Sequence, residues 1–137
     1  MLKINLKYVF VLLIIAFACS RSHNSSERKH IKKGFGKVSI SNNESYYYFN
    51  PDTTNNKLPV VYFFDSQANG KFPVEKYQSL SEKYNIILIG SNNIKNGLKR
   101  STINEHIKTL FINTNKNFVI NPKALYFAGF SGGARMA

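Results

Sequence analysis

The sequence predicts an α/β fold built on a parallel sheet, and three observations lead to that prediction. Apolar runs at 60–64, 86–89 and 125–128 have the length and composition of strands buried on both faces. Segments 73–84 and 102–117 lie between these runs and repeat their apolar residues at helical spacing. This alternation of strands and helices favours right-handed crossovers between parallel strands.

A hairpin is expected before the first buried strand. Segments 37–40 and 46–49 are short runs with β-branched or aromatic residues, and Asn42-Asn43-Glu44 between them is a turn signal. The polar stretch 51–59 then forms a loop that leads into the strand at 60–64.

The first helix is expected at 73–84. Pro73 suits a first helical turn, and apolar residues recur from Val74 to Tyr84 at roughly helical spacing. The strand at 86–89 follows and is closed by Gly90. Further along the chain, Asn121-Pro122 is interpreted as a breaker before the strand at 125–128.

The second helix is expected at 102–117. Thr102 and Glu105 have the spacing of a capping box at its start. His106 lies away from the apolar stripe of this helix and is expected to be exposed to solvent. The stripe consists of residues spaced as one helical face: Ile103, Ile107, Leu110 and Phe111.

Composition limits the classes of protein that the chain can belong to. Its 137 residues allow one domain at most, and 43% hydrophobic residues are enough for a packed core. The net charge of +12 could attract nucleic acid or an acidic surface, but the basic residues are scattered. Compositional bias is therefore the preferred explanation of the positive charge, and no specific nucleic-acid partner is expected. A single Cys excludes a disulfide framework, and no metal site or cofactor is predicted.

The first 18 residues are predicted to be a signal peptide. Lys3 and Lys7 form a basic start, and an uncharged, strongly apolar segment follows at 8–20. That segment is too short to span a bilayer. The alternative is a buried N-terminal helix of a soluble protein.

The apolar segment ends in Ala16-Phe17-Ala18-Cys19-Ser20, which resembles a bacterial lipobox. The resemblance implies that Cys19 is lipidated and becomes the mature N-terminus, which would anchor the protein to a membrane in the bacterial cell envelope. An ordinary signal peptide with an incidental Cys is the alternative. Segment 19–36 is polar and basic and is expected to be a flexible tether to a domain at 37–137.

The motif with the clearest chemical meaning directly follows the last strand. Gly129, Ser131 and Gly133 satisfy G-x-S-x-G. In a tight turn from strand to helix, the glycines let backbone segments approach, and the serine hydroxyl is exposed above the sheet. The alternative is a glycine-rich turn with a structural role only.

With the segment order at 37–137, this G-F-S-G-G-A elbow resembles the α/β-hydrolase superfamily, in particular secreted bacterial esterases and peptidase-like hydrolases. The resemblance implies that Ser131 is the nucleophile and that the Gly132 N–H is one oxyanion donor. It puts the second donor in the loop after the strand at 60–64, where Ser66 or Gln67 would supply the N–H. Asp65 stands in that loop where the family often has His or Gly.

The family's triad order is Ser, then Asp or Glu, then His, but no acidic residue or His follows Ser131 in this chain. All three histidines, His23, His30 and His106, precede it. The chain is therefore predicted to be the N-terminal fragment of a membrane-anchored serine hydrolase that acts on small-molecule or peptide esters or amides, or the product of a truncated gene. In either case we expect it to be inactive alone. The alternative is a non-catalytic surface lipoprotein on a hydrolase-like scaffold.

Overall fold

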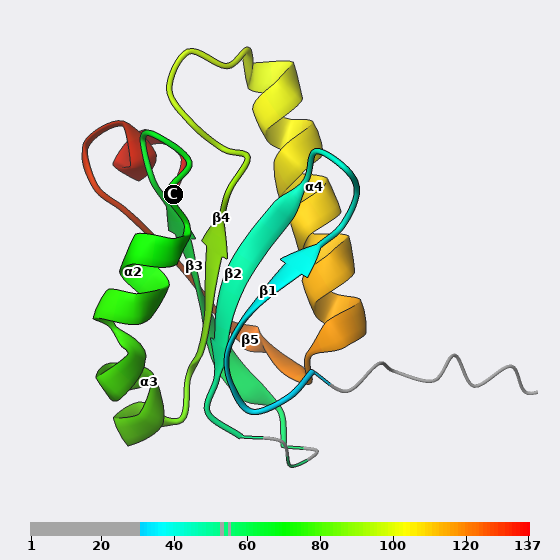
Figure 1. The fold of residues 1–137 in the computed structure, drawn as a ribbon, viewed down its shortest axis with the longest axis vertical. Helices are drawn as coiled ribbons and strands as arrows, with labels where there is room; N and C mark the ends of the chain where they lie inside the picture. Colours follow the sequence, from blue (N-terminus) through cyan, green and yellow to red (C-terminus); the bar gives the residue numbers. More distant parts are fainter. Residues whose placement is uncertain (1–30, 53, 55) are drawn as a thin grey trace, which may run out of the picture.

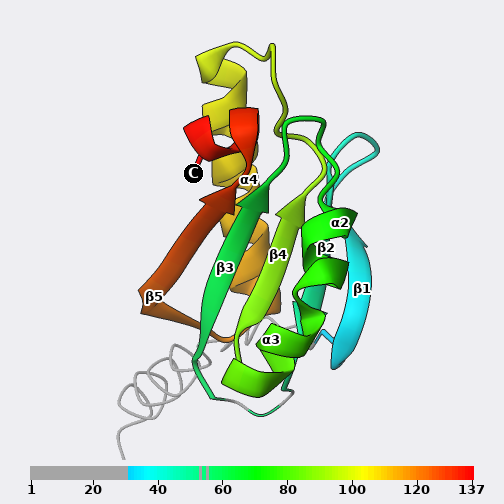
Figure 2. The same cartoon turned by 90° about the vertical axis from the view of Figure 1, so that its left-hand side faces the viewer.

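The computed structural model describes residues 31–52, 54 and 56–137, so the predicted signal peptide and Cys19 lie outside the described residues. The described chain forms one five-stranded sheet in the order β1-β2-β4-β3-β5. Figure 2 shows this sheet face-on. Its strands are β1 (Gly34–Ser39), β2 (Ser45–Asn50), β3 (Leu58–Phe64), β4 (Ile87–Ser91) and β5 (Ile120–Gly129).

The sheet combines an antiparallel hairpin with a parallel section. β1 and β2 pair antiparallel, which confirms the predicted hairpin, although β1 begins at Gly34 rather than at residue 37. β2 also pairs antiparallel with β4. Strands β3, β4 and β5 are parallel, with Val61 opposite Leu88 on one side and Tyr126 on the other. The α/β fold with a parallel sheet is thus confirmed.

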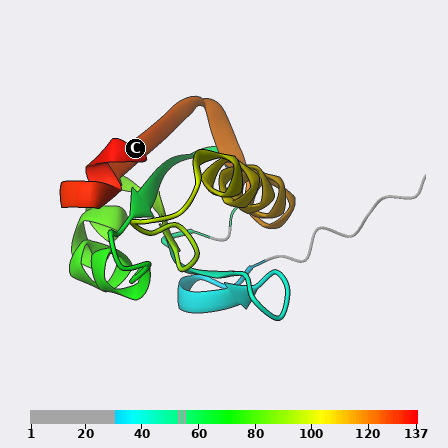
Figure 3. The same cartoon turned by 90° about the horizontal axis from the view of Figure 1, so that it is seen from above.

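Helices cover both faces of the sheet. α2 (Lys71–Lys76) and α3 (Gln78–Tyr84) lie on one face, and α4 (Arg100–Asn117) lies on the other (Figures 1 and 3). The prediction of one helix at 73–84 is wrong, because Tyr77 leaves the helical conformation between α2 and α3, with φ −104° and ψ 11°. The Tyr77 ring stacks on Phe63 of β3 at 5.5 Å between centroids, so packing on the sheet accompanies the break.

Helix α4 begins earlier than the sequence predicts. Its N-cap is Lys99 and its first residue is Arg100, with no side-chain capping bond. The predicted capping box is therefore wrong, because Thr102 and Glu105 already lie inside the helix. The described part of the chain contains no helix with the length and hydrophobicity of a transmembrane span.

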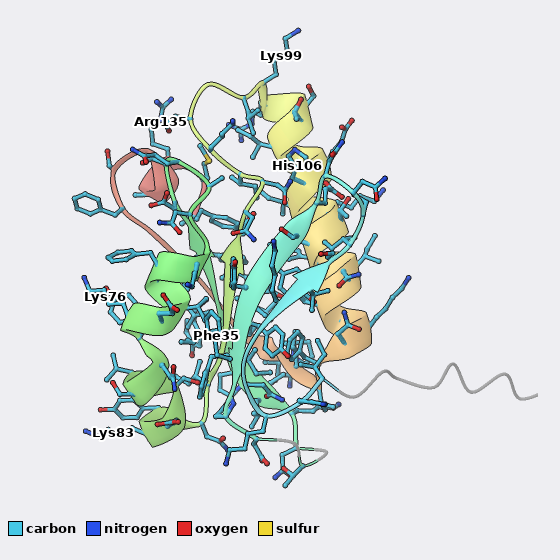
Figure 4. All side chains as sticks on the ribbon, in the orientation of Figure 1. Phe35, Lys76, Lys83, Lys99, His106 and Arg135 are labelled. Atoms are coloured by element: carbon cyan, nitrogen blue, oxygen red, sulfur yellow. The ribbon has the colours of Figure 1, made fainter. Side chains whose placement is uncertain are left out.

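The predicted apolar stripe of α4 is confirmed as its packing face. Leu110 is buried in the main core, and Ile103, Ile107 and Phe111 pack against that core. His106 corrects the expectation of solvent exposure: its side chain is only 23% exposed, and its Nδ1 lies 2.5 Å from Oε1 of Glu44. This contact joins α4 to the β1–β2 turn (Figure 4).

The main core lies between the sheet and α4 and contains buried tyrosines. The Tyr62 hydroxyl hydrogen-bonds the Thr114 hydroxyl at 2.9 Å, and the Tyr46 hydroxyl donates to Oδ1 of Asn113 at 3.0 Å. Burial raises the pKa of both phenols above their ordinary value. A smaller cluster of Phe49, Val74 and Leu88 packs beneath α2.

Strand β5 forms one edge of the sheet. Its pairing with β3 is irregular between Ile120 and Leu125 and regular from Leu125 to Gly129. The breaker Asn121-Pro122 therefore lies inside the strand, where it interrupts the register instead of preceding the strand. Proline tolerates such a place because it has no N–H to contribute to a ladder. Within the described residues, the outer edge of β5 has no strand partner.

Candidate active site

Three loops meet at the carboxyl ends of the parallel strands. They are the β3–α2 loop, the β4–α4 loop and the turn that follows β5, and they lie together at the top of Figure 1. In open α/β sheets, ligands bind outside the carboxyl ends of the strands. This end of the molecule also holds the sequence motif around Ser131.

Ser131 has a strained backbone. Its φ is +53°, in the left-handed region that non-glycine residues rarely adopt. The residue is exposed and directly precedes the buried Gly132. A conformation of this kind costs on the order of 1–3 kcal/mol and is typical of functional sites. The sequence predicted the start of an α-helix after this turn, but Ser131–Arg135 form a short 3₁₀ helix, η1.

The two flanking glycines are required by close backbone packing. A Cβ at Gly129 would collide with the backbone of Gly133, and a Cβ at Gly133 would collide with the carbonyl oxygen of Phe64. The turn is therefore folded back on the end of β5 and pressed against the end of β3. Only residues without a side chain fit these two positions.

Two backbone amides of the predicted oxyanion hole are unpaired among the described residues. Neither the Gly132 N–H nor the Ser66 N–H donates a hydrogen bond to any residue that the structure describes. The Gln67 N–H, the alternative to Ser66, donates to Oδ1 of Asp65 at 2.8 Å. Of the two candidates for the second oxyanion donor, Ser66 is therefore the one whose amide is available.

Asp65 has a structural task in this loop. Its Oδ1 accepts hydrogen bonds from the Gln67 N–H and, at 3.1 Å, from the Asn69 N–H. The same turn holds Ala68 at a φ of +61°. An Asp side chain that bonds backbone two residues on stabilises a tight turn. Asp65 therefore shapes the β3–α2 loop.

Asn96 in the β4–α4 loop is a site residue that sequence reasoning missed. Its N–H donates to the carbonyl oxygen of Ser66 at 3.0 Å. Its side-chain amide lies against Gly132, where a Cβ would collide with it. Asn96 lies in a segment rich in Asn and Gly, and the sequence carries no signal for these two contacts.

An aromatic cavity of about 440 Å³ lies next to the turn, between β3, β5 and α2. Phe130, the residue before Ser131, is 87% exposed at its rim. Lys76 lies on the same side, with its Nζ 5.5 Å from the centre of the Phe72 ring (Figure 4). The remaining lining residues are Phe63, Phe64, Asp65, Pro73, Tyr77, Ala128 and Gly129.

The only histidine among the described residues is His106. It is bound to Glu44 at the turn of the β1–β2 hairpin. No hydrogen bond or ion pair joins it to Ser131 in the described part of the chain. The loops that carry Ser131 and Ser66 thus meet at one end of the sheet, but no histidine among the described residues is bonded to Ser131.

Comparisons with known proteins support the fold. No family model matches the chain, and no curated protein matches it. A solved structure does match: a CE1 ferulic acid esterase from Anaeromyces mucronatus in complex with ferulic acid, with a TM-score of 0.56 and 18% sequence identity. The match covers 80% of this chain and 55% of the esterase, so the chain spans about half of that protein's length. The chain therefore has part of an α/β-hydrolase fold.

Proposed function

We propose that Ser131 is the nucleophile of a serine hydrolase that cleaves esters or amides. The observation that carries the proposal is the exposed Ser131 with φ +53°, on a turn that its flanking glycines press against the sheet. Strained backbone conformations persist only where the surrounding structure enforces them, and they cluster at active sites. A nucleophile gives a reason for serine at this position.

The proposed reaction is an acyl transfer. Oγ of Ser131 attacks the substrate carbonyl carbon while its proton passes to a base, and the carbonyl oxygen becomes an oxyanion. The N–H groups of Gly132 and Ser66 receive this charge. Collapse of the tetrahedral intermediate expels the alcohol or amine, and water then releases the acyl group.

The base and its acidic partner are proposed to come from outside the described residues. His106 is engaged by Glu44, and a serine hydroxyl without a base is a weak nucleophile near neutral pH. The matched esterase is almost twice as long as the segment that it shares with this chain. The 137-residue chain alone is therefore expected to hydrolyse esters no faster than buffer.

The proposed substrate is a small ester with an apolar or aromatic group. The cavity beside the turn is lined largely by aromatic rings, and such rings stack favourably on aromatic groups. The structurally similar esterase was solved with ferulic acid, an aromatic carboxylic acid. A peptide amide remains the second substrate class for the same nucleophile.

The proposed location is the bacterial cell envelope, with the protein held to a membrane by acyl chains on Cys19. The support is the sequence alone: a basic start, a short apolar segment and the single Cys at its end. Radiolabelled palmitate should enter the wild-type protein and not Cys19→Ala. Equal labelling of both would contradict the anchor.

A non-catalytic surface lipoprotein is the second candidate, and the absence of a histidine beside Ser131 among the described residues favours it. An assay with p-nitrophenyl esters separates the two candidates. The protein as its natural host makes it should hydrolyse p-nitrophenyl acetate, and Ser131→Ala should abolish the rate, with exposed Ser101→Ala as the matched control. Equal rates in all three proteins would favour the non-catalytic candidate.

A further inference from the structure

The β4–α4 loop contacts both residues whose amides are proposed to bind the oxyanion. We propose that Asn96, in this loop, is a positioning residue that holds the Ser66 and Gly132 amides in place. The inference rests on the proposed function of Ser131 and adds a residue from a third segment of the chain to that site.

The first contact fixes the Ser66 side of the site. The Asn96 N–H donates to the Ser66 carbonyl oxygen at 3.0 Å, and the Gln67 N–H of the same peptide group donates to Asp65 at 2.8 Å. Gln67 and Lys95 also form an antiparallel bridge between the two loops. The peptide group that follows Ser66 is thus held at both ends, which limits movement of the Ser66 backbone that carries the N–H.

The second contact is made by the Asn96 side chain. The three atoms nearest to a Cβ placed on Gly132 are Oδ1, Cγ and Nδ2 of Asn96, so the amide group lies directly against this glycine. Gly132 is buried although Asn96 itself is exposed. The Asn96 amide group lies against Gly132 at the place where a Cβ would stand, so we expect it to act on Gly132 through its shape. Any larger residue at 132 would displace it.

These contacts matter because oxyanion donors need accurate placement. Supporting residues must hold such groups within about 0.5 Å, and removal of one donor typically costs on the order of 10²–10³ in rate. Asn96→Ala leaves the backbone bond to Ser66 in place but uncovers Gly132. We therefore expect Asn96→Ala to slow the chemical step about tenfold, a partial loss, with little change in KM.

The experiment compares three variants by two measurements. Asn96→Ala removes the amide group, Asn96→Leu keeps its approximate shape, and Lys99→Ala alters an exposed residue of the same loop (Figure 4). The first measurement is the ¹H–¹⁵N spectrum of the 137-residue chain. The second is the rate at which a fluorophosphonate probe modifies Ser131 in the protein made by its natural host.

In Asn96→Ala the Gly132 amide resonance should shift, and probe modification should slow about tenfold at an unchanged melting temperature. Asn96→Leu should restore most of the rate, and Lys99→Ala should match the wild type. An unmoved Gly132 resonance with an unchanged rate in Asn96→Ala would overturn the positioning role. Failure of the probe to modify wild-type Ser131 would instead overturn the proposed function, and the Gly132 resonance would still decide whether Asn96 holds that amide.

Discussion

Replacement of Ser131 by glycine should stabilise the fold while it removes the nucleophile. Relief of the left-handed backbone should raise the free energy of unfolding by about 1–2 kcal/mol. The greater freedom of glycine in the unfolded chain should lower it by about 0.4–1 kcal/mol. Ser131 has φ +53° and is exposed, so removal of its side chain costs little buried surface. The expected net gain is about 0.5–1 kcal/mol, or a rise of about 2–8 °C in melting temperature for a domain of this size.

Thermal unfolding followed by circular dichroism measures this gain. Ser131→Ala is the matched control, because alanine removes the hydroxyl but keeps the strain, so its melting temperature should equal that of the wild type. Ser101→Gly, on the exposed side of α4, should give no gain, because its backbone is helical. A Ser131→Gly protein that melts at or below the temperature of Ser131→Ala would refute the strain at this turn.

Two further predictions concern packing and pH. Gly133→Ala should destabilise by about 1–3 kcal/mol in urea unfolding, because its Cβ meets the Phe64 carbonyl, and a loss below 0.5 kcal/mol would contradict that contact. For Tyr62, burial raises the pKa of the phenol above its ordinary 10.0. The neutral phenol therefore contributes stability that is complete below pH 10 and is lost as the pH rises through the folded pKa. Tyr62→Phe removes the hydrogen bond to Thr114, so its free energy of unfolding at pH 8 should be about 1 kcal/mol lower than that of the wild type. Between pH 9 and 11, however, its free energy of unfolding should fall less than that of the wild type. An equal fall in the free energy of unfolding of both proteins at alkaline pH would count against a raised pKa of the Tyr62 phenol.

The elements that the sequence predicted well are those encoded locally. The run at 60–64 consists of consecutive apolar residues, and the structure buries Val60, Tyr62 and Phe64 in the main core. The G-x-S-x-G turn was also predictable, because its glycines and its position after a strand lie in one short segment. Local propensity and hydrophobic pattern decide such features.

The features that the sequence missed depend on residues far apart in the chain. His106 pairs with Glu44 across 62 positions, which no pattern within α4 could indicate. The contacts of Asn96 with Ser66 and Gly132 likewise join three separate loops. Only the arrangement of the strands in the sheet brings these loops together, at the carboxyl ends of the parallel strands. The candidate nucleophile was therefore predictable, while the residues that support it were not.

Covalent modification decides whether Ser131 is an activated nucleophile. The protein made by its natural host would be treated with a fluorophosphonate probe, digested, and analysed by mass spectrometry. Only an activated serine attacks phosphorus readily, so the adduct should be found on Ser131 alone and should disappear after denaturation before treatment. An adduct on another serine, or no adduct on Ser131 in the folded protein, would show that Ser131 is not an activated nucleophile.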